Sequence, residues 1–302
     1  MTSAAIIIVI ISAFIHALWN LVGKRESPSP GFFLQATVLG CLCLVPVVFV
    51  HLGVVRVFPG RVWWLLVGTG LCQAAYYTGL AGAYRCGHLS VAYPLARSLP
   101  VIMVAVVSAL LGHGKQFGGA VIVGFGLIVV GGMVLPIDRL SEWKLRDYLH
   151  ASTLFALLAA AGTTGYSIID DAALRLLRAN PNVHVGRAWL TLVYTLLEGL
   201  SSTVWLAVMM RVMRGINGSA KPRHYKLSSV AFAGIGIYLA YSLVLLAMTF
   251  ATNVSYIVAF RQLSIPIGAA LGMTVLREPR DPAKLLGIAI MLAGLLMVAG
   301  GR

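Results

Sequence analysis

Long apolar stretches, separated by short polar or Pro- and Gly-containing connections, follow one another along the whole chain. Each stretch has about 20 residues, the length that an α-helix needs to cross the hydrocarbon layer of a membrane. Because a bilayer offers no water to unpaired backbone groups, such stretches fold as helices. The pattern predicts ten membrane-spanning helices, at residues 4–23, 31–55, 62–85, 89–112, 116–135, 150–169, 187–211, 227–250, 254–276 and 283–300.

Polar and small residues recur at a nearly constant separation in the two halves of the chain. The separation is 164 residues for Tyr77 and Tyr241 and for Arg97 and Arg261, and 163 for Gly124 and Gly287 and for Gly131 and Gly294. Five crossings leave the chain on the opposite side, so a repeated five-helix unit is inverted in its second copy. The sequence therefore predicts two inverted five-helix repeats, 1–135 and 150–302, joined by an interfacial linker at 136–149.

The composition agrees with an all-α, multi-pass membrane protein. Hydrophobic residues make up 59% of the chain and charged residues 11%, against about 25% charged residues in soluble domains. The net charge of +14 lies mainly in short connections, which favours contact with anionic membrane lipids and argues against nucleic acid. More Lys and Arg fall on the side away from the N-terminus, so the positive-inside rule places both termini outside the cell.

Motifs for catalysis and cofactor binding do not occur in the sequence. The four cysteines form no CxxC pair, and there is no Walker A, HExxH or GxSxG sequence. We therefore expect no metal, no cofactor, no catalytic residue and no ATP-driven transport by this chain. It is not expected to be an enzyme.

Two arginines, Arg97 and Arg261, fall inside apolar stretches. An arginine in hydrocarbon costs at least about 2.5–3.5 kcal/mol, so it needs a partner, water or a ligand. Arg97 lies about 13 Å into its predicted helix, with Tyr93 one turn earlier. Arg261 lies about 10 Å in and can reach the interface more easily. We interpret both as candidate ligands for a substrate carboxylate or phosphate; the alternative is an internal contact that only fixes packing.

Glu198 belongs to a polar face of the predicted helix 187–211, shared by Thr191, Tyr194, Thr195, Ser201, Ser202 and Trp205. A carboxyl group on such a face can exchange a proton or bind an amine, and Glu198 is the coupling candidate; the alternative is a structural Glu–Arg pair. Asp170 continues a similar face formed by Thr163, Tyr166 and Ser167. Because Asp170 and Asp171 come at the predicted end of their span, we expect them in the headgroup region.

The first span carries His16, Trp19 and Asn20 on one helical face, where they can donate hydrogen bonds to a substrate or relay a proton. A histidine that only bonds across helices is the alternative. The recurring Tyr77 and Tyr241 are the aromatic candidates for the lining of a cavity.

The chain resembles the EamA branch of the drug/metabolite transporter superfamily. The resemblance is carried by FIHALWN at 14–20, AYRCGHLSVAYPLAR at 83–97, SIPIGAALG at 264–272 and LREP at 276–279. It implies ten helices in two inverted repeats, a central cavity, and export or exchange of small metabolites such as amino acids across the cell (inner) membrane. It also implies cytoplasmic termini, in conflict with the charge distribution. Where small multidrug members carry a proton-coupling glutamate in the first helix, this chain has His16.

These observations predict a secondary active transporter, an exporter or exchanger of small polar or anionic metabolites that works by alternating access. A proton or a counter-substrate is the candidate coupling partner. Two other functions remain open: a flippase for a phosphate-bearing lipid, and a membrane-embedded enzyme that modifies lipids.

Overall fold

The structure of the chain is a computed structural model. It describes residues 2–25, 29–85, 89–114, 117–134, 151–217, 224–275, 277 and 281–301. Over these ranges the chain contains helices and no strand. The predicted linker at 136–149 lies outside the described residues.

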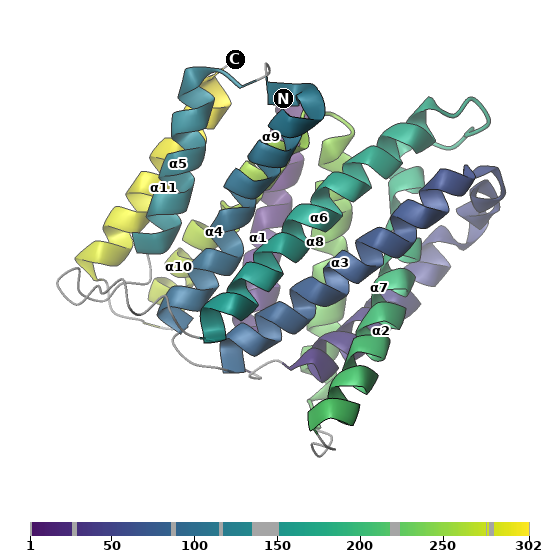
Figure 1. The fold of residues 1–302 in the computed structure, drawn as a ribbon, viewed down its shortest axis with the longest axis horizontal. Coiled ribbons are helices and arrows are strands. Elements are labelled where there is room, and N and C mark those ends of the chain that lie inside the picture. Colours follow the sequence, from purple (N-terminus) through teal and green to yellow (C-terminus); the bar gives the residue numbers. More distant parts are fainter. Residues whose placement is uncertain are drawn as a thin grey trace.

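The helices follow one another along the chain as the colours of Figure 1 show. Their bounds are α1 Ser3–Arg25, α2 Pro30–Val48, α3 Gly60–Arg85, α4 Leu89–Ser108, α5 Gly119–Val134, α6 Ala151–Ala179, α7 Arg187–Asn217, α8 Leu227–Met248, α9 Val254–Arg261, α10 Ser264–Val275 and α11 Pro282–Gly300. A 3₁₀ helix, η1 (Phe49–Val57), extends α2, and a π-helical turn, η2 (Ala109–His113), extends α4. Local sequence sets several ends. Ser29 accepts hydrogen bonds from the first amides of α2, where Pro30 begins the helix, and Asn253 caps α9.

One predicted helix, the span at 254–276, is broken in the structure, so the prediction of a continuous helix there is wrong. Pro266 explains the break, because its ring has no amide hydrogen for the carbonyl of Gln262 and would clash with it in a continuous helix. The chain instead makes tight turns between α9 and α10, in which Leu263 N donates to Phe260 O and Ile265 N to Gln262 O. Pro266 then falls in the first turn of α10, where proline is tolerated. The break lies directly after Arg261.

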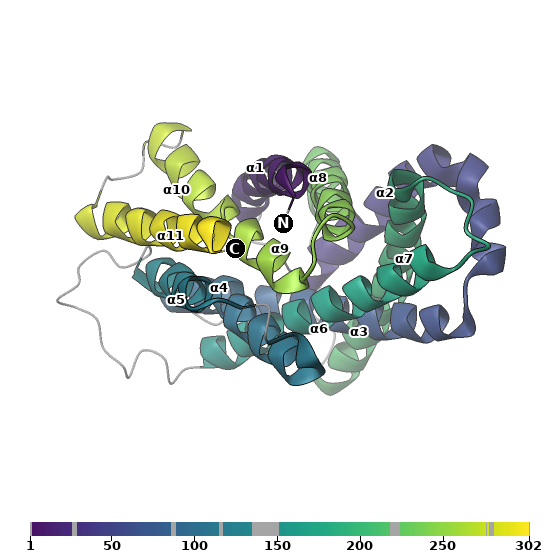
Figure 2. The same cartoon turned by 90° about the horizontal axis from the view of Figure 1, so that it is seen from above.

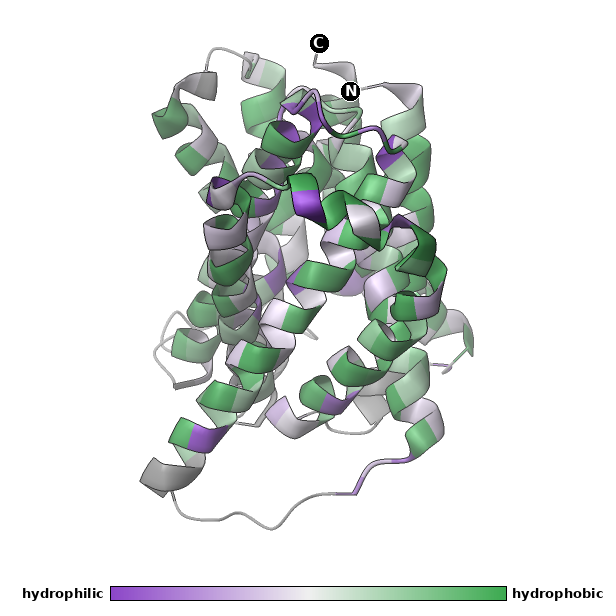
Figure 3. Cartoon of the chain, turned by 90° about the vertical axis from the view of Figure 1, so that its right-hand side faces the viewer, coloured by the Kyte–Doolittle hydropathy of each residue, from purple (hydrophilic) through white to green (hydrophobic). Residues whose placement is uncertain are grey.

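Within the described ranges, seven helical segments are long and apolar enough to cross a membrane: α1, α2 with η1, α6, α7, α8, α9 with α10, and α11. Large apolar side chains are exposed on the outside of the bundle, which soluble proteins avoid over such areas, and Figure 3 shows this apolar colouring along the outer helices. Examples with more than half of their surface exposed are Leu42, Trp64, Leu110, Leu154 and Leu296. The chain is an all-α protein whose surface fits a membrane.

The helices pack as a set of matched pairs. The pairs α3 with α6 and α1 with α8 pack along their lengths, as do α2 with α7 and α5 with α11. Viewed from above in Figure 2, α5 and α11 form one end of the molecule, α2, α7 and η1 form the other, and α1, α6, α8 and α9 lie between them. The buried core follows the same axis, and its middle contains most of the buried polar residues discussed below.

Glycines bring the α5–α11 pair into close contact. A Cβ atom added at Gly124 would lie 2.8 Å from the carbonyl oxygen of Gly294, and one at Gly131 would lie 2.7 Å from that of Gly287. These are the four glycines that recur in the sequence. Backbones can approach this closely only where no side chain intervenes.

Candidate functional site

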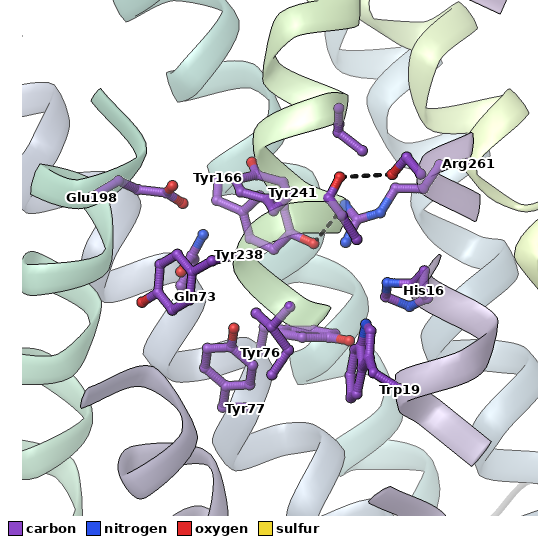
Figure 4. A pocket seen from close by; sticks show the side chains of 14 residues that line it. His16, Trp19, Gln73, Tyr76, Tyr77, Tyr166, Glu198, Tyr238, Tyr241 and Arg261 are labelled. Carbon is purple, nitrogen blue, oxygen red and sulfur yellow. Dashed lines mark hydrogen bonds between the residues drawn. The ribbon is translucent and has the colours of Figure 1, made fainter. Parts of the chain in front are cut away.

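A small cavity lies in the middle of the bundle, between α1, α3, α6, α7, α8 and α9 (Figure 4). Its volume is about 30 Å³, room for about two water molecules. Aromatic and polar side chains provide most of the lining: Ser12, His16, Trp19, Gln73, Tyr76, Tyr77, Tyr166, Glu198, Tyr238, Tyr241 and Arg261. The cavity is therefore a polar, tyrosine-rich chamber inside an apolar bundle.

Arg261 reaches this cavity from the C-terminal end of α9, where the helix breaks. Its Nη1 donates to the hydroxyl of Tyr166 at 2.9 Å, and its Cζ lies 5.7 Å and 5.3 Å from the ring centres of Tyr166 and Tyr241. Cation–π contacts of this kind stabilise a buried guanidinium. Among the described residues no carboxylate forms an ion pair with it, so a positive charge faces the cavity without an acidic partner.

Arg97 lies beside the cavity and not in its lining. Its Nη1 lies 2.6 Å from His16 Nε2, and its Nη2 donates to Ser264 Oγ at 2.6 Å. Because a guanidinium only donates, the His16 nitrogen accepts this bond. Ser264 in turn donates to the carbonyl of Arg261 at 2.9 Å, at the break between α9 and α10. Arg97 thus connects α4 and α1 to the broken helix, and His16 connects it to the cavity.

Asp170 is fully buried inside the bundle, which its predicted position at the end of a span did not indicate. The prediction ended the span at residue 169, whereas α6 continues to Ala179. Both carboxylate oxygens of Asp170 are bonded: Oδ1 accepts from Tyr194 at 2.8 Å and Oδ2 from Tyr241 at 2.5 Å. Asp171, by contrast, pairs with Arg175, whose side chain is 45% exposed.

Glu198 lies on the side of the cavity opposite Arg261, with tyrosines between them (Figure 4). Its side chain is buried, and neither carboxyl oxygen has a hydrogen-bond partner in the described part of the chain. Thr191, Tyr194, Thr195 and Ser202 are buried on the same face of α7, so this part of the predicted polar face points into the bundle. Buried polar atoms are almost always hydrogen-bonded. A carboxyl group without a partner, such as that of Glu198, is therefore available to bind a solute or a proton.

The other predicted site residues are distributed unevenly around the cavity. Tyr77, stacked 5.0 Å from Phe33, and Trp19, in edge contact 4.9 Å from His16, both line it. The indole nitrogen of Trp19 has no partner among the described residues. Asn20 is half-buried and outside the lining. The side chain of Tyr93 lies outside the described residues.

Several residues of the site were not predicted as site residues, namely Ser12, Gln73, Tyr76, Tyr166 and Tyr238 in the lining and Asp170 beside it. Gln73 lines the cavity, and its signal in the sequence is a lone amide one turn before Tyr76 and Tyr77 on an apolar helix. Asp170 does not line the cavity, yet it holds one of the lining tyrosines. The described residues contain no group of three or more side chains that could hold a metal ion.

No protein-family model matches the chain, and no curated protein matches it. Its fold is similar to that of a solved structure described as "Crystal structure of protein", with a TM-score of 0.70 and 17% sequence identity. The match covers 99% of this chain and 97% of the other. At this identity the similarity concerns the fold alone.

Proposed function

We propose that the chain is a secondary active transporter of the EamA type, with ten membrane spans in two inverted five-helix repeats. The packing pattern supports the repeats. We count α9 and α10 together as the ninth span and α11 as the tenth, so that each span of the first repeat has its counterpart five places later. The counterpart of the α1–α8 pair is then the α6–α3 pair, and the counterpart of the α3–α7 pair is the α8–α2 pair. All of these pairs are in contact, and the glycine contacts of α5 and α11 exchange in the same way.

The arginines support the same symmetry at the level of single contacts. Arg97, on the fourth span, touches His16 on the first, and Arg261, on the ninth, touches Tyr166 on the sixth. Each arginine thus bonds the first helix of its own repeat. A site at the interface of two inverted repeats, beside a broken helix, is the usual place for a transporter's substrate.

The solute that fits this site is small and carries an anionic group. The observation that supports this most directly is the buried guanidinium of Arg261, which faces the cavity without an acidic partner in the described part of the chain. A carboxylate or phosphate can accept two parallel bonds from such a group. On the opposite side, the unpaired Glu198 can take an amine of the solute or a proton, so small metabolites such as amino acids are suitable candidates.

The size of the cavity supports transport by alternating access. A space for about two waters is smaller than an amino acid, so the site must enlarge before a solute of that size enters. A cavity of this size corresponds to a contracted state of the transporter without solute. We place the protein in the cell (inner) membrane, with exchange against a proton or a counter-substrate as its driving reaction.

A counterflow screen of the purified protein in liposomes tests this function. Liposomes are loaded with amino acids, phosphonates or organic amines, and uptake of the same radiolabelled solute is followed. We expect accumulation for at least one anionic or zwitterionic solute, and none in liposomes without protein. No counterflow with any of these classes would contradict the proposal. Turnover of a lipid or solute in detergent, where no compartments exist, would favour an enzyme.

A further inference from the structure

Two buried charges of opposite sign, Arg261 and Asp170, lie in one aromatic cluster and yet form no ion pair. Tyr241 stands between them: its hydroxyl donates to Asp170 Oδ2 at 2.5 Å, and its ring faces the Arg261 guanidinium at 5.3 Å. Tyr166 continues the cluster, because its ring packs edge-on against that of Tyr241 at 5.4 Å while its hydroxyl accepts from Arg261. The carboxylate is held by Tyr194 and Tyr241, and the guanidinium contacts Tyr166 and Tyr241.

This separation has an electrostatic consequence. Tyr241 contacts both groups, so only one tyrosine side chain separates the Asp170 carboxylate from the Arg261 guanidinium, and charges in a bundle interior attract one another more strongly than in water. The carboxylate therefore partly neutralises the arginine without occupying its hydrogen-bonding edge. Both oxygens of Asp170 are already bonded to tyrosines, so it is not itself free to bind the guanidinium.

We propose that Asp170 is a positioning and affinity-setting residue for the anion site at Arg261. Asp170 fixes Tyr241 against the guanidinium, and its negative charge lowers the affinity of the guanidinium for a solute anion so that the anion can leave again. This inference rests on the proposed function for its biological meaning. It adds a residue that does not touch the solute but sets how tightly the solute is held.

The other repeat supports a dedicated role for Asp170. His16 and Tyr166 are the matching contacts of the two arginines, and the residue one turn after each is Asn20 in α1 and Asp170 in α6. Only the second repeat therefore has a negative charge at this position. The fold of the repeat therefore does not require an acidic residue at this position, and the acidic residue occurs only in the repeat whose arginine faces the cavity.

Binding of formate to the purified protein in detergent tests the proposal, because formate is planar and small enough for a cavity of two waters. Formate affinity is measured from thermal unfolding at rising formate concentration and constant ionic strength. Asp170→Asn keeps the size of the side chain and removes its charge, so we expect formate to bind about tenfold more tightly. Arg261→Gln should abolish formate binding, both alone and combined with Asp170→Asn.

Two further variants separate positioning from a general structural effect. Asp171→Asn removes the neighbouring carboxylate, which is paired with Arg175 at the end of the bundle, and should leave formate affinity within twofold of the unmodified protein. Tyr241→Phe keeps the charge of Asp170 but removes the hydroxyl that holds it, which lets Asp170 turn toward Arg261. We expect formate to bind several-fold more weakly in this variant. A purely structural role would weaken binding in both Asp170→Asn and Tyr241→Phe.

The proposal is overturned by unchanged or weaker formate binding in a folded Asp170→Asn variant. It is equally overturned if neither the unmodified protein nor Asp170→Asn binds formate through Arg261. If Asp170→Asn does not fold, unchanged formate affinity in Tyr241→Phe overturns the proposal instead. Because formate binding needs no transport, the proposed function can fail in the counterflow screen while this inference stands, and the reverse.

Discussion

At the scale of single residues, the described part of the bundle contains four buried charged side chains, which have different kinds of partners. Arg97 bonds to His16 and Ser264, Arg261 to Tyr166, and Asp170 to two tyrosines, whereas Glu198 has no partner in the described structure. A buried polar atom without a partner costs about 1–3 kcal/mol. Removal of Arg97 would thus leave its hydrogen-bond partners without a donor, whereas removal of Glu198 would not.

The contrast predicts opposite effects on stability. Arg97→Ala leaves His16 Nε2 and Ser264 Oγ without their donor, so we expect the free energy of unfolding to fall by about 1–3 kcal/mol. Glu198→Gln removes a charge that has no counterpart, and stability should stay equal or rise. Thermal unfolding in detergent measures both, with Arg175→Gln as a surface control. Equal destabilisation by Arg97→Ala and Glu198→Gln would show that the difference in their contacts has no energetic effect.

The sequence predicts the recurring residues of the site better than the isolated ones. Tyr77, Tyr241, Arg97 and Arg261 can be found because each has a counterpart at the same separation. Asp170 could not be placed, because apolar length alone does not show that α6 extends ten residues beyond the predicted end of its span. The choice between Arg97 and Arg261 as the residue facing the cavity depends on side-chain direction, which the sequence does not contain.

At the scale of elements, the helices follow the apolar pattern while their breaks follow special residues. The predicted helical segments occur over the described residues, but the ninth is divided because Pro266 cannot continue a helix that began at Val254. The recurring glycines have a function that the sequence could only indicate: they allow the backbones of α5 and α11 to touch.

Two glycines on α5 offer a matched test of this contact. A Cβ at Gly131 would lie 2.6 Å from the backbone nitrogen of Met291, whereas one at Gly126 would meet nothing within 4 Å. We expect Gly131→Ala to destabilise the protein by about 1–3 kcal/mol through overpacking. Gly126→Ala should stabilise it by about 0.5–1 kcal/mol, because alanine loses less backbone entropy in a helix. Thermal unfolding of both variants decides the point, and a similar loss for the two would contradict close packing at Gly131.

At the scale of the whole molecule, the ten crossings that we propose would place the two termini on the same side. The α6–α7 connection, with the exposed His184, then lies on the side of the termini, and the α7–α8 connection, with the exposed His224, lies on the opposite side. In Figure 1 both termini lie at the same end of the bundle.

Single cysteines at these two positions, in a variant without the native cysteines, test the topology in intact cells. A membrane-impermeant maleimide should label one of His184→Cys and His224→Cys and not the other until the cells are opened. Labelling of both cysteines from outside would contradict a membrane crossing by α7 between the two connections. The labelled side also decides between the charge distribution, which places the termini outside, and the family resemblance, which places them in the cytoplasm.

The central claim is that the guanidinium of Arg261 binds the anionic group of a transported solute inside the bundle. The most direct measurement is counterflow of that solute in liposomes with Arg261→Gln. Arg175→Gln serves as the control, because Arg175 lies outside the cavity lining and is paired with Asp171. We predict that Arg261→Gln loses at least about 90% of the initial rate, as expected when a charge-assisted bond worth about 1.5–3 kcal/mol disappears, while Arg175→Gln keeps most of it. A folded Arg261→Gln protein that transports at the unmodified rate would contradict the account.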